Sequence, residues 1–245
     1  MNDGNDRPAG VAAPSLTPPP LATLAHGGTG VLVAVDPAVV SPALRDLIAG
    51  GGYEAGEANL VSRLVEPGDC VLELGAGLGF IAALVGMRCH PRRYIAVEAD
   101  PRLPPLIAAT LRANGVAVAR IVSGILTNDA AKLAAGSVPF RIEAHFWGSH
   151  EVSAETAGAR PVPVQSLDAV LAGEGVTVMI VDVEGGEAGL FEGANLAGVR
   201  AIFVETHADR IGSGGYARLF ATLTAAGLIY DPALSQGYLL TFRRW

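Results

Sequence analysis

The sequence is poor in cysteine and in basic residues, and both shortages exclude classes of protein. Two cysteines among 245 residues are too few for a disulfide framework or a cysteine zinc site. Cys70 lies in a buried-strand pattern, where cysteine is typically a small hydrophobic residue. Lysine and arginine total 17 against 24 acidic residues, giving a formal net charge of −7. Because nucleic acids and anionic membranes are bound through basic surfaces, neither is expected as a partner.

The sequence also lacks long apolar runs, since none approaches the ~18 residues that a transmembrane helix needs. The first residues, MNDGNDRPAG, lack the basic start and apolar core of a secretory signal. We therefore expect a cytoplasmic protein. Half of the residues are hydrophobic and 17% are charged, a composition typical of a compact globular body with a large core.

Residues 1–28 are rich in proline, alanine and glycine, which predicts a disordered arm before a single domain over residues 29–245. Strands and helices then alternate, a pattern that predicts right-handed crossovers and a mostly parallel, doubly wound α/β sheet. Hydrophobic patterns predict strands at 31–35, 70–74, 94–97, 118–122, 176–181, 201–204, 228–230 and 238–242, and helices at 42–48, 54–64, 80–87, 101–114, 167–171, 188–196 and 216–226. Between residues 124 and 165 we expect only an alternating edge strand at 141–146 and a loop at 151–160.

The most informative local motif is the glycine loop VLELGAGLGF at residues 71–80. Gly75, Gly77 and Gly79 follow a predicted strand and precede a helix, where glycines let the backbone approach a ligand closely. The dinucleotide pattern G-x-G-x-x-G would need glycine at position 80, which is Phe80. The E-x-G-x-G-x-G spacing that begins at Glu73 instead resembles the S-adenosylmethionine (SAM) loop of class I methyltransferases.

Glu98 ends the next predicted strand, where a carboxylate can accept hydrogen bonds from both ribose hydroxyls of a nucleoside. Two alternatives remain open for this pair of motifs. One is an NAD(P)-dependent oxidoreductase, against which Phe80 argues. The other is a tight glycine turn with Glu98 capping the helix that follows.

Several separated motifs together resemble the FkbM-type methyltransferases, SAM-dependent enzymes that mostly O-methylate hydroxyls. The motifs that carry the resemblance are GGYEAGEANLVSRLVEPGD at 51–69, VLELGAGLGF, VEADP at 97–101, PVQSLDAVL at 163–171, IVDVEGGEAGLFEGA at 180–194, VETH at 204–207 and GYLLTFRRW at the end. The resemblance implies a seven-stranded Rossmann-like sheet with an antiparallel C-terminal strand. The sequence departs from the family pattern at Glu73, Gly77 and Ile180, where aspartate, asparagine and lysine are usual.

The resemblance implies SAM as cofactor and a hydroxyl of a small molecule or glycan as acceptor. The cofactor-binding set that we expect is Glu54, Glu73, Gly75, Ala76, Gly77, Gly79, Glu98, Ala99 and Asp182. Strand ends of a parallel sheet meet at one edge, so Glu73, Glu98, Asp182 and Glu205 are expected to rim one crevice. A catalytically inactive relative that keeps the fold as a binding module stays an alternative.

Four residues near the ends of the fourth and fifth predicted strands are catalytic candidates: Asp182, Glu184, Glu205 and His207. Asp182 would orient the acceptor hydroxyl or accept its proton. The ordinary pKa of histidine, ~6.5, suits His207 as the base, with Glu205 beside it to fix the tautomer. A divalent cation held by Asp182, Glu205 and His207 is the alternative that we favour less.

Each candidate also has a purely structural interpretation. Carboxylates at a helix start complement its dipole, which we favour for Glu187 and for Glu54 and leave open for Glu184. His207 could be a hydrogen-bonded loop residue. Phe146, Trp147 and His150 could line a pocket or pack in the core, and nothing in the sequence separates these two interpretations.

Overall fold

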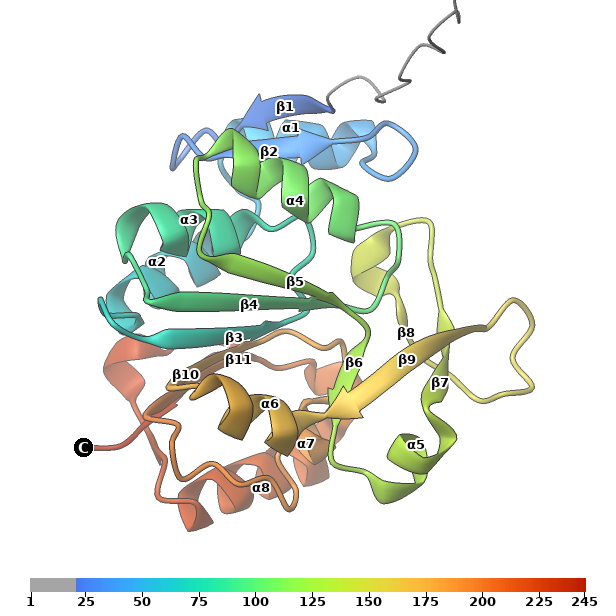
Figure 1. Cartoon of the computed structure of the whole chain (residues 1–245), viewed down its shortest axis with the longest axis vertical. Coiled ribbons are helices and arrows are strands. Elements are labelled where there is room, and N and C mark those ends of the chain that lie inside the picture. Colours follow the sequence, from blue (N-terminus) through green and yellow to red (C-terminus); the bar gives the residue numbers. More distant parts are fainter. Residues whose placement is uncertain (1–20) are drawn as a thin grey trace, which may run out of the picture.

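A computed structural model describes residues 21–245 and shows an α/β architecture (Figure 1). Its central sheet has seven strands, in the order β12 (Ile229–Tyr230), β13 (Leu239–Arg243), β11 (Ala201–Glu205), β10 (Val178–Val181), β3 (Cys70–Leu74), β4 (Arg93–Glu98) and β5 (Ala119–Ser123). The five strands from β11 to β5 are parallel, whereas β13 runs antiparallel to both of its neighbours. The predicted doubly wound, mostly parallel seven-stranded sheet is confirmed.

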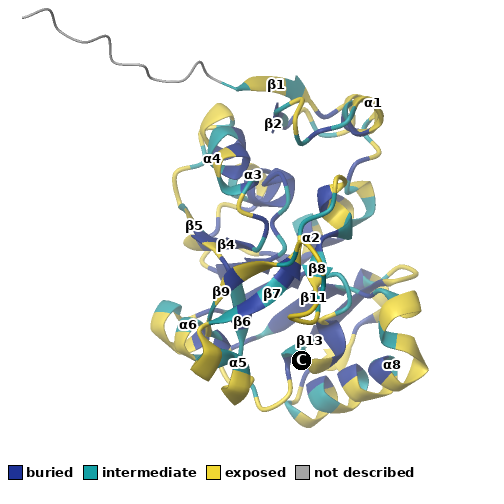
Figure 2. Ribbon diagram, turned by 90° about the vertical axis from the view of Figure 1, so that its right-hand side faces the viewer, coloured by how far each residue is buried: buried dark blue, intermediate teal, exposed yellow. Residues whose placement is uncertain are grey.

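The central strands are buried on both faces because their alternating side chains feed two cores. On β3, Val71 enters one core and Leu72 the other, and the same alternation runs along β10. The first core packs against helices α2 (Ala55–Leu64), α3 (Phe80–Arg88) and α4 (Pro104–Ala113). The second packs against α6 (Leu167–Glu174), α7 (Glu187–Leu190) and α8 (Ala208–Ala225). Figure 2 shows the buried strands between helices, of which α4, α6 and α8 have exposed outer surfaces.

The part of the expected arm that the structure describes is folded, which corrects the predicted boundary at residue 28. Strand β1 (Ala22–Ala25) pairs antiparallel with β2 (Leu32–Val35), and α1 (Pro42–Gly50) follows. His26 is buried, and its Nε2 lies 2.9 Å from the carbonyl oxygen of Tyr53. This hydrogen bond and the β1–β2 ladder hold the segment, although its composition is typical of disorder. Residues 1–20 lie outside the described residues.

Residues 125–166 form a second sheet, which the sequence did not predict. Its strands are β6 (Ile125–Thr127), β9 (Arg160–Ser166), β7 (Ser137–Arg141) and β8 (His150–Glu151), with α5 (Ala130–Ala135) between β6 and β7. The edge strand predicted at 141–146 is wrong, because β7 ends at Arg141. Beyond it, Glu143 is held by Arg102, which donates to its carbonyl oxygen, and by Ser149, which accepts from its N–H. The 3-10 helix η1 (Phe146–Gly148) follows.

Two helices also differ from their predictions. The helix predicted at 188–196 is a single turn, α7, because the chain turns away before Gly193, which has a φ of 71°. Helix α8 begins at Ala208, eight residues before the predicted start, and is interrupted at Gly212, where φ is 59°. Its glycine-rich first half hides the helical pattern in the sequence. The 3-10 helix η2 (Pro232–Leu234) precedes β13. Within residues 21–245, no helix combines the length and apolar character needed to cross a bilayer.

Candidate active site

The glycine loop joins β3 to α3 at the carboxyl edge of the sheet. Gly75 has a φ of 86°, and a Cβ on it would overlap the carbonyl oxygen of Asp182. Gly77 and Gly79 also have positive φ, a conformation that side chains disfavour. The loop therefore packs directly on the residue that follows β10, and this close approach requires glycine at position 75.

Glu98 ends β4 and faces the loop. Its Oε2 accepts a hydrogen bond of 2.9 Å from the Gly77 N–H, and its Oε1 accepts one of 2.8 Å from the Asp100 N–H. Burial raises the pKa of Glu98 to about 7. Each carboxylate oxygen has a second lone pair, so the group can accept further hydrogen bonds from a ligand while it holds the loop.

A cavity of about 1360 Å³ opens over the loop and the strand ends. The predicted site residues that line it are Glu54, Gly75, Gly77, Glu98, Ala99, Asp182, Glu184 and Glu205. Four others are not in its wall: Glu73, Ala76, Gly79 and His207. Glu73 lies under the loop within β3, 3% exposed, where burial raises its pKa to about 8. The expectation that Glu73 rims the crevice is thus wrong, because a side chain inside a strand points across the sheet rather than beyond its end.

Tyr53 is a site residue that the sequence did not single out. Its side chain lines the cavity yet is 8% exposed, and within the described residues its hydroxyl has no hydrogen-bond partner. A Cβ on Gly77 would lie 3.2 Å from this hydroxyl and 3.7 Å from Glu54 Oε1, so both groups face the loop. Glu54 itself has a φ of 47° at the start of α2. The only available signal was an aromatic residue directly before an acid at a predicted helix start.

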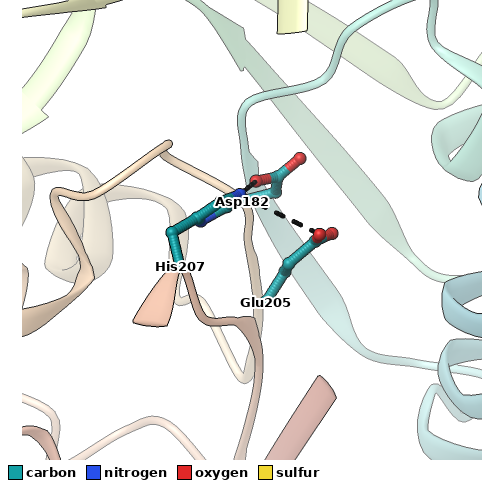
Figure 3. Close-up of side chains that lie close together, drawn as sticks. All are labelled: Asp182, Glu205 and His207. Carbon is teal, nitrogen blue, oxygen red and sulfur yellow. Dashed lines mark ion pairs between the residues drawn. The ribbon is translucent and has the colours of Figure 1, made fainter. Parts of the chain in front are cut away.

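The catalytic candidates form a cluster at the ends of β10 and β11. Figure 3 shows Asp182, Glu205 and His207 with their polar atoms turned toward one another. His207 Nε2 lies 3.7 Å from Asp182 Oδ1 and 3.9 Å from Glu205 Oε1. Glu184 Oε2 lies 3.4 Å from the same nitrogen, and Arg210 Nη2 lies 3.2 Å from that oxygen. The structure thus brings all four candidates together and adds Arg210.

Glu187 holds the imidazole of His207. It is fully buried, and its Oε1 accepts a hydrogen bond of 2.6 Å from His207 Nδ1 and one of 3.0 Å from the Gly185 N–H. This corrects two expectations: Glu187 rather than Glu205 orients the imidazole, and Glu187 is more than a helix-start acid. Glu187 and His207 are 20 residues apart in sequence, so only the fold reveals the pair.

Electrostatics change the protonation of this cluster. The hydrogen bond that His207 donates to Glu187, and then the nearby charges of Glu184 and Asp182, raise the pKa of His207 to about 9. Burial, and then the charge of Glu184, raise the pKa of Asp182 to about 7. Burial, and then the charge of Asp182, raise the pKa of Glu205 to about 8. The pKa of His207 is therefore raised by its carboxylate neighbours, which corrects the expectation of an ordinary histidine pKa.

The second sheet covers the far side of the cavity. Phe146, Trp147 and His150 all line it, and Phe146 also packs in the first core. Phe146 is buried, whereas Trp147 is 44% exposed and stacks on His145 at a ring distance of 4.8 Å. Phe80, at the position where a dinucleotide loop needs glycine, is fully buried beside His26.

Comparison with known proteins identifies one family model that matches the sequence and several solved structures with a similar fold. A family model described as Methyltransferase FkbM domain matches residues 73–230. No curated protein matches the chain significantly. Among solved structures, Trm5b from Pyrococcus abyssi has a TM-score of 0.50 and 12% identity, covering 91% of this chain and 56% of that one. The chain thus spans a little over half the length of Trm5b.

Two further solved structures are similar at comparable identity. TYW2 from M. jannaschii, solved in complex with AdoMet, has a TM-score of 0.46 and 12% identity over 88% of this chain and 84% of that one. Precorrin-6y C5,15-methyltransferase from Geobacter metallireducens GS-15 has a TM-score of 0.47 and 10% identity over 86% and 94%. At such identities these likenesses concern the fold alone.

Proposed function

Because this chain belongs to the FkbM methyltransferase domain family, we propose that it is a SAM-dependent O-methyltransferase acting on a hydroxyl of a small molecule or glycan. The observation that carries the proposal is the contact between Gly75 and Asp182, which puts the glycine loop, Glu98 and Asp182 around one cavity. A nucleoside site and a group able to act on a hydroxyl are therefore adjacent.

The residues around the loop fit the nucleoside part of SAM. Glu98 lines the cavity at a strand end and keeps free lone pairs on both carboxylate oxygens, as ribose recognition requires. Gly75 and Gly77 leave the backbone open to close approach. Ala99, in the same wall, would lie beside the base. Ala76 and Gly79 would support the loop from behind, and Glu73 would support it from below.

Tyr53 and Glu54 fit the amino acid part of SAM. The buried Tyr53 hydroxyl has no hydrogen-bond partner in residues 21–245. It can donate a hydrogen bond, which the carboxylate of a ligand could accept. Glu54, beside it at Gly77, offers an acceptor for an ammonium group. A zwitterionic amino acid end supplies both complements, which an NAD(P) pyrophosphate does not.

SAM, when bound, would supply an electrophilic methyl group for the acceptor oxygen, with SAH as the leaving group. Asp182 would orient that oxygen, because its side chain is 43% exposed while Oδ1 is buried, so Oδ2 is the oxygen that faces the cavity. Oδ2 is thereby placed to hold the hydroxyl proton. Holding the acceptor in line would provide most of the acceleration.

The cavity also supports a cofactor and an acceptor bound together. Single small-molecule sites usually measure roughly 300–1,000 Å³, and this cavity is larger, at about 1360 Å³. The acceptor would occupy the half that the second sheet covers, where Trp147 offers an exposed ring. Carboxylates outnumber the two basic groups in the wall, Lys132 and Arg210, which disfavours a polyanion such as RNA.

Calorimetry with S-adenosylhomocysteine (SAH) tests the proposal. The full chain should bind SAH, and Glu98→Gln should weaken binding by about 10-fold, because one ribose acceptor becomes a donor. Glu66→Gln, at a side chain that is 72% exposed and outside the cavity wall, should bind like the parent. Absence of binding at millimolar SAH would refute the proposal. SAH binding without methyl transfer to any hydroxyl acceptor would instead support the non-catalytic alternative.

A further inference from the structure

The cluster of Asp182, Glu205 and His207 has the donor set of a metal site. Each residue contributes one ligand atom, and the three atoms lie within 4.8 Å of one another. Ligand atoms bonded to one ion at about 2.1 Å lie roughly 3.0–3.4 Å apart. The separations of 3.7 and 3.9 Å from His207 Nε2 are slightly longer, so small side-chain rotations would bring the three atoms onto one ion.

His207 has carboxylate oxygens around its Nε2 but none within ordinary hydrogen-bond distance. Its Nδ1 donates to the buried Glu187, so Nε2 faces the three carboxylates. When Nε2 is unprotonated, its lone pair faces oxygen lone pairs, which repel it. When it is protonated, its proton faces oxygens at 3.4–3.9 Å, beyond the usual reach of a hydrogen bond. The spacing fits a cation larger than a proton.

Asp182 gives independent support. Its Oδ1, the oxygen directed at Nε2, is buried and has no hydrogen-bond partner among residues 21–245. A buried carboxylate oxygen without a partner is costly and rare unless a ligand completes it. Glu184, in contrast, is engaged by Arg210, which binds both its carboxylate and its carbonyl oxygen. Glu184 is therefore outside the ligand set.

We propose that Asp182 Oδ1, Glu205 and His207 Nε2 bind one divalent first-row cation, of the Mn²⁺, Fe²⁺ or Zn²⁺ class. An imidazole among the ligands favours these ions over Mg²⁺ and Ca²⁺, which prefer oxygen alone. Glu187 would be the outer carboxylate that orients a ligating histidine. Because Asp182 and Glu205 line the cavity, the ion's open positions would face the acceptor.

The role of the ion rests on the proposed function, although its binding does not. A hydroxyl that coordinates an open position is oriented by the ion and becomes more acidic. The exposed Oδ2 of Asp182 remains beside it to hold the proton. The site would thus serve an acceptor with an alcohol or phenol oxygen next to a second oxygen that can share the ion.

Titration of the EDTA-treated, desalted full chain with Mn²⁺, followed by electron paramagnetic resonance, tests the proposal. We expect one saturable site with a ¹⁴N coupling from His207. Asp182→Asn and His207→Ala should each weaken Mn²⁺ binding at least 10-fold, and His207→Ala should remove the coupling. Glu187→Gln should weaken binding about 10–100-fold. Glu192→Gln, in the same cavity wall but outside the cluster, should bind like the parent.

Absence of saturable binding at millimolar Mn²⁺, or binding unchanged in Asp182→Asn, would overturn the proposal. SAH calorimetry on the same samples separates this result from the proposed function. SAH binding without an Mn²⁺ site would support the proposed function and refute the proposed metal site. If the chain shows an Mn²⁺ site with the ¹⁴N coupling but does not bind SAH, the metal site is supported and the methyltransferase proposal is refuted.

Discussion

Glu187 and His207 come from different elements and are joined by a hydrogen bond of 2.6 Å, with Glu187 fully buried. Glu187 opens the single-turn helix α7, and His207 precedes α8. The bond fixes the plane of the imidazole and therefore the direction in which Nε2 points. The geometry of the whole cluster depends on this one pair.

The strength of the Glu187–His207 pair can be measured with a double-mutant cycle. We expect Glu187→Gln and His207→Asn each to lower the free energy of unfolding, and the double variant to lose less than their sum. The coupling should be about 1.5–3 kcal/mol, since the bond joins charged groups. Urea denaturation in EDTA measures it. A coupling near zero would show that the pair does not act as a unit.

The close approach of Gly75 to Asp182 predicts a sharp effect of one methyl group. Gly75→Ala should abolish SAH binding and destabilise the fold by more than ~3 kcal/mol, because its Cβ meets backbone that cannot move aside. Gly136→Ala is the matched control, since Gly136 also has positive φ but has nothing within 4 Å of the added Cβ. It should cost only about 1 kcal/mol in strain.

Equal losses of unfolding free energy in Gly75→Ala and Gly136→Ala would contradict this explanation. Both variants should be compared by urea denaturation and SAH calorimetry. The contrast separates backbone strain, which the two glycines share, from the contact with Asp182, which only Gly75 makes.

Tyr53→Phe should separate stability from binding. Since the hydroxyl is buried without a partner in residues 21–245, its removal should leave the free energy of unfolding unchanged or raise it by up to about 1 kcal/mol. SAH affinity should fall about 5–10-fold, because the variant cannot donate the hydrogen bond that the Tyr53 hydroxyl would make to SAH. Thermal denaturation and calorimetry give both numbers. Lower stability with unchanged affinity would show that the hydroxyl is structural.

The central sheet could be predicted from the sequence because its strands are continuous apolar runs between turn signals. β3 begins and ends at the predicted residues, and β4 and β11 extend beyond their predictions by only one or two residues at an end. The glycine spacing and the position of Glu98 likewise predicted a ligand site at the strand ends. These features are local, and local patterns are what a single sequence records.

The features that escaped prediction depend on contacts between distant residues. Two strands of the second sheet, β6 and β8, have only three and two residues, so they show no period to detect. The roles of Glu187 and Tyr53 follow from burial, which brings Glu187 to His207 and Tyr53 to Gly77. Neither partner is close in sequence. The raised pKa of His207 could not be predicted without that contact.

The raised pKa of Glu73 predicts how the free energy of unfolding depends on pH. Burial, the largest cause, raises its pKa from 4.5 to about 8, and its Oε2 has no partner among the described residues. The folded protein therefore binds a proton that the unfolded chain releases between pH 4.5 and about 8. Stability from this group is complete below pH 4.5 and falls as pH rises to about 8, by on the order of 3 kcal/mol at pH 7.

Glu73→Gln should remove this dependence, because the amide has the shape of the neutral acid and does not titrate. At pH 8 the variant should be more stable than the parent by on the order of 4 kcal/mol, and near pH 4.5 the difference should vanish. Urea denaturation at the two pH values measures it, with Glu66→Gln as a surface control. A variant that is less stable than the parent at pH 8 would show that Glu73 is charged and stabilised by the loop above it. In that case Glu73 would belong to the electrostatics of the cofactor site rather than to the core of the sheet.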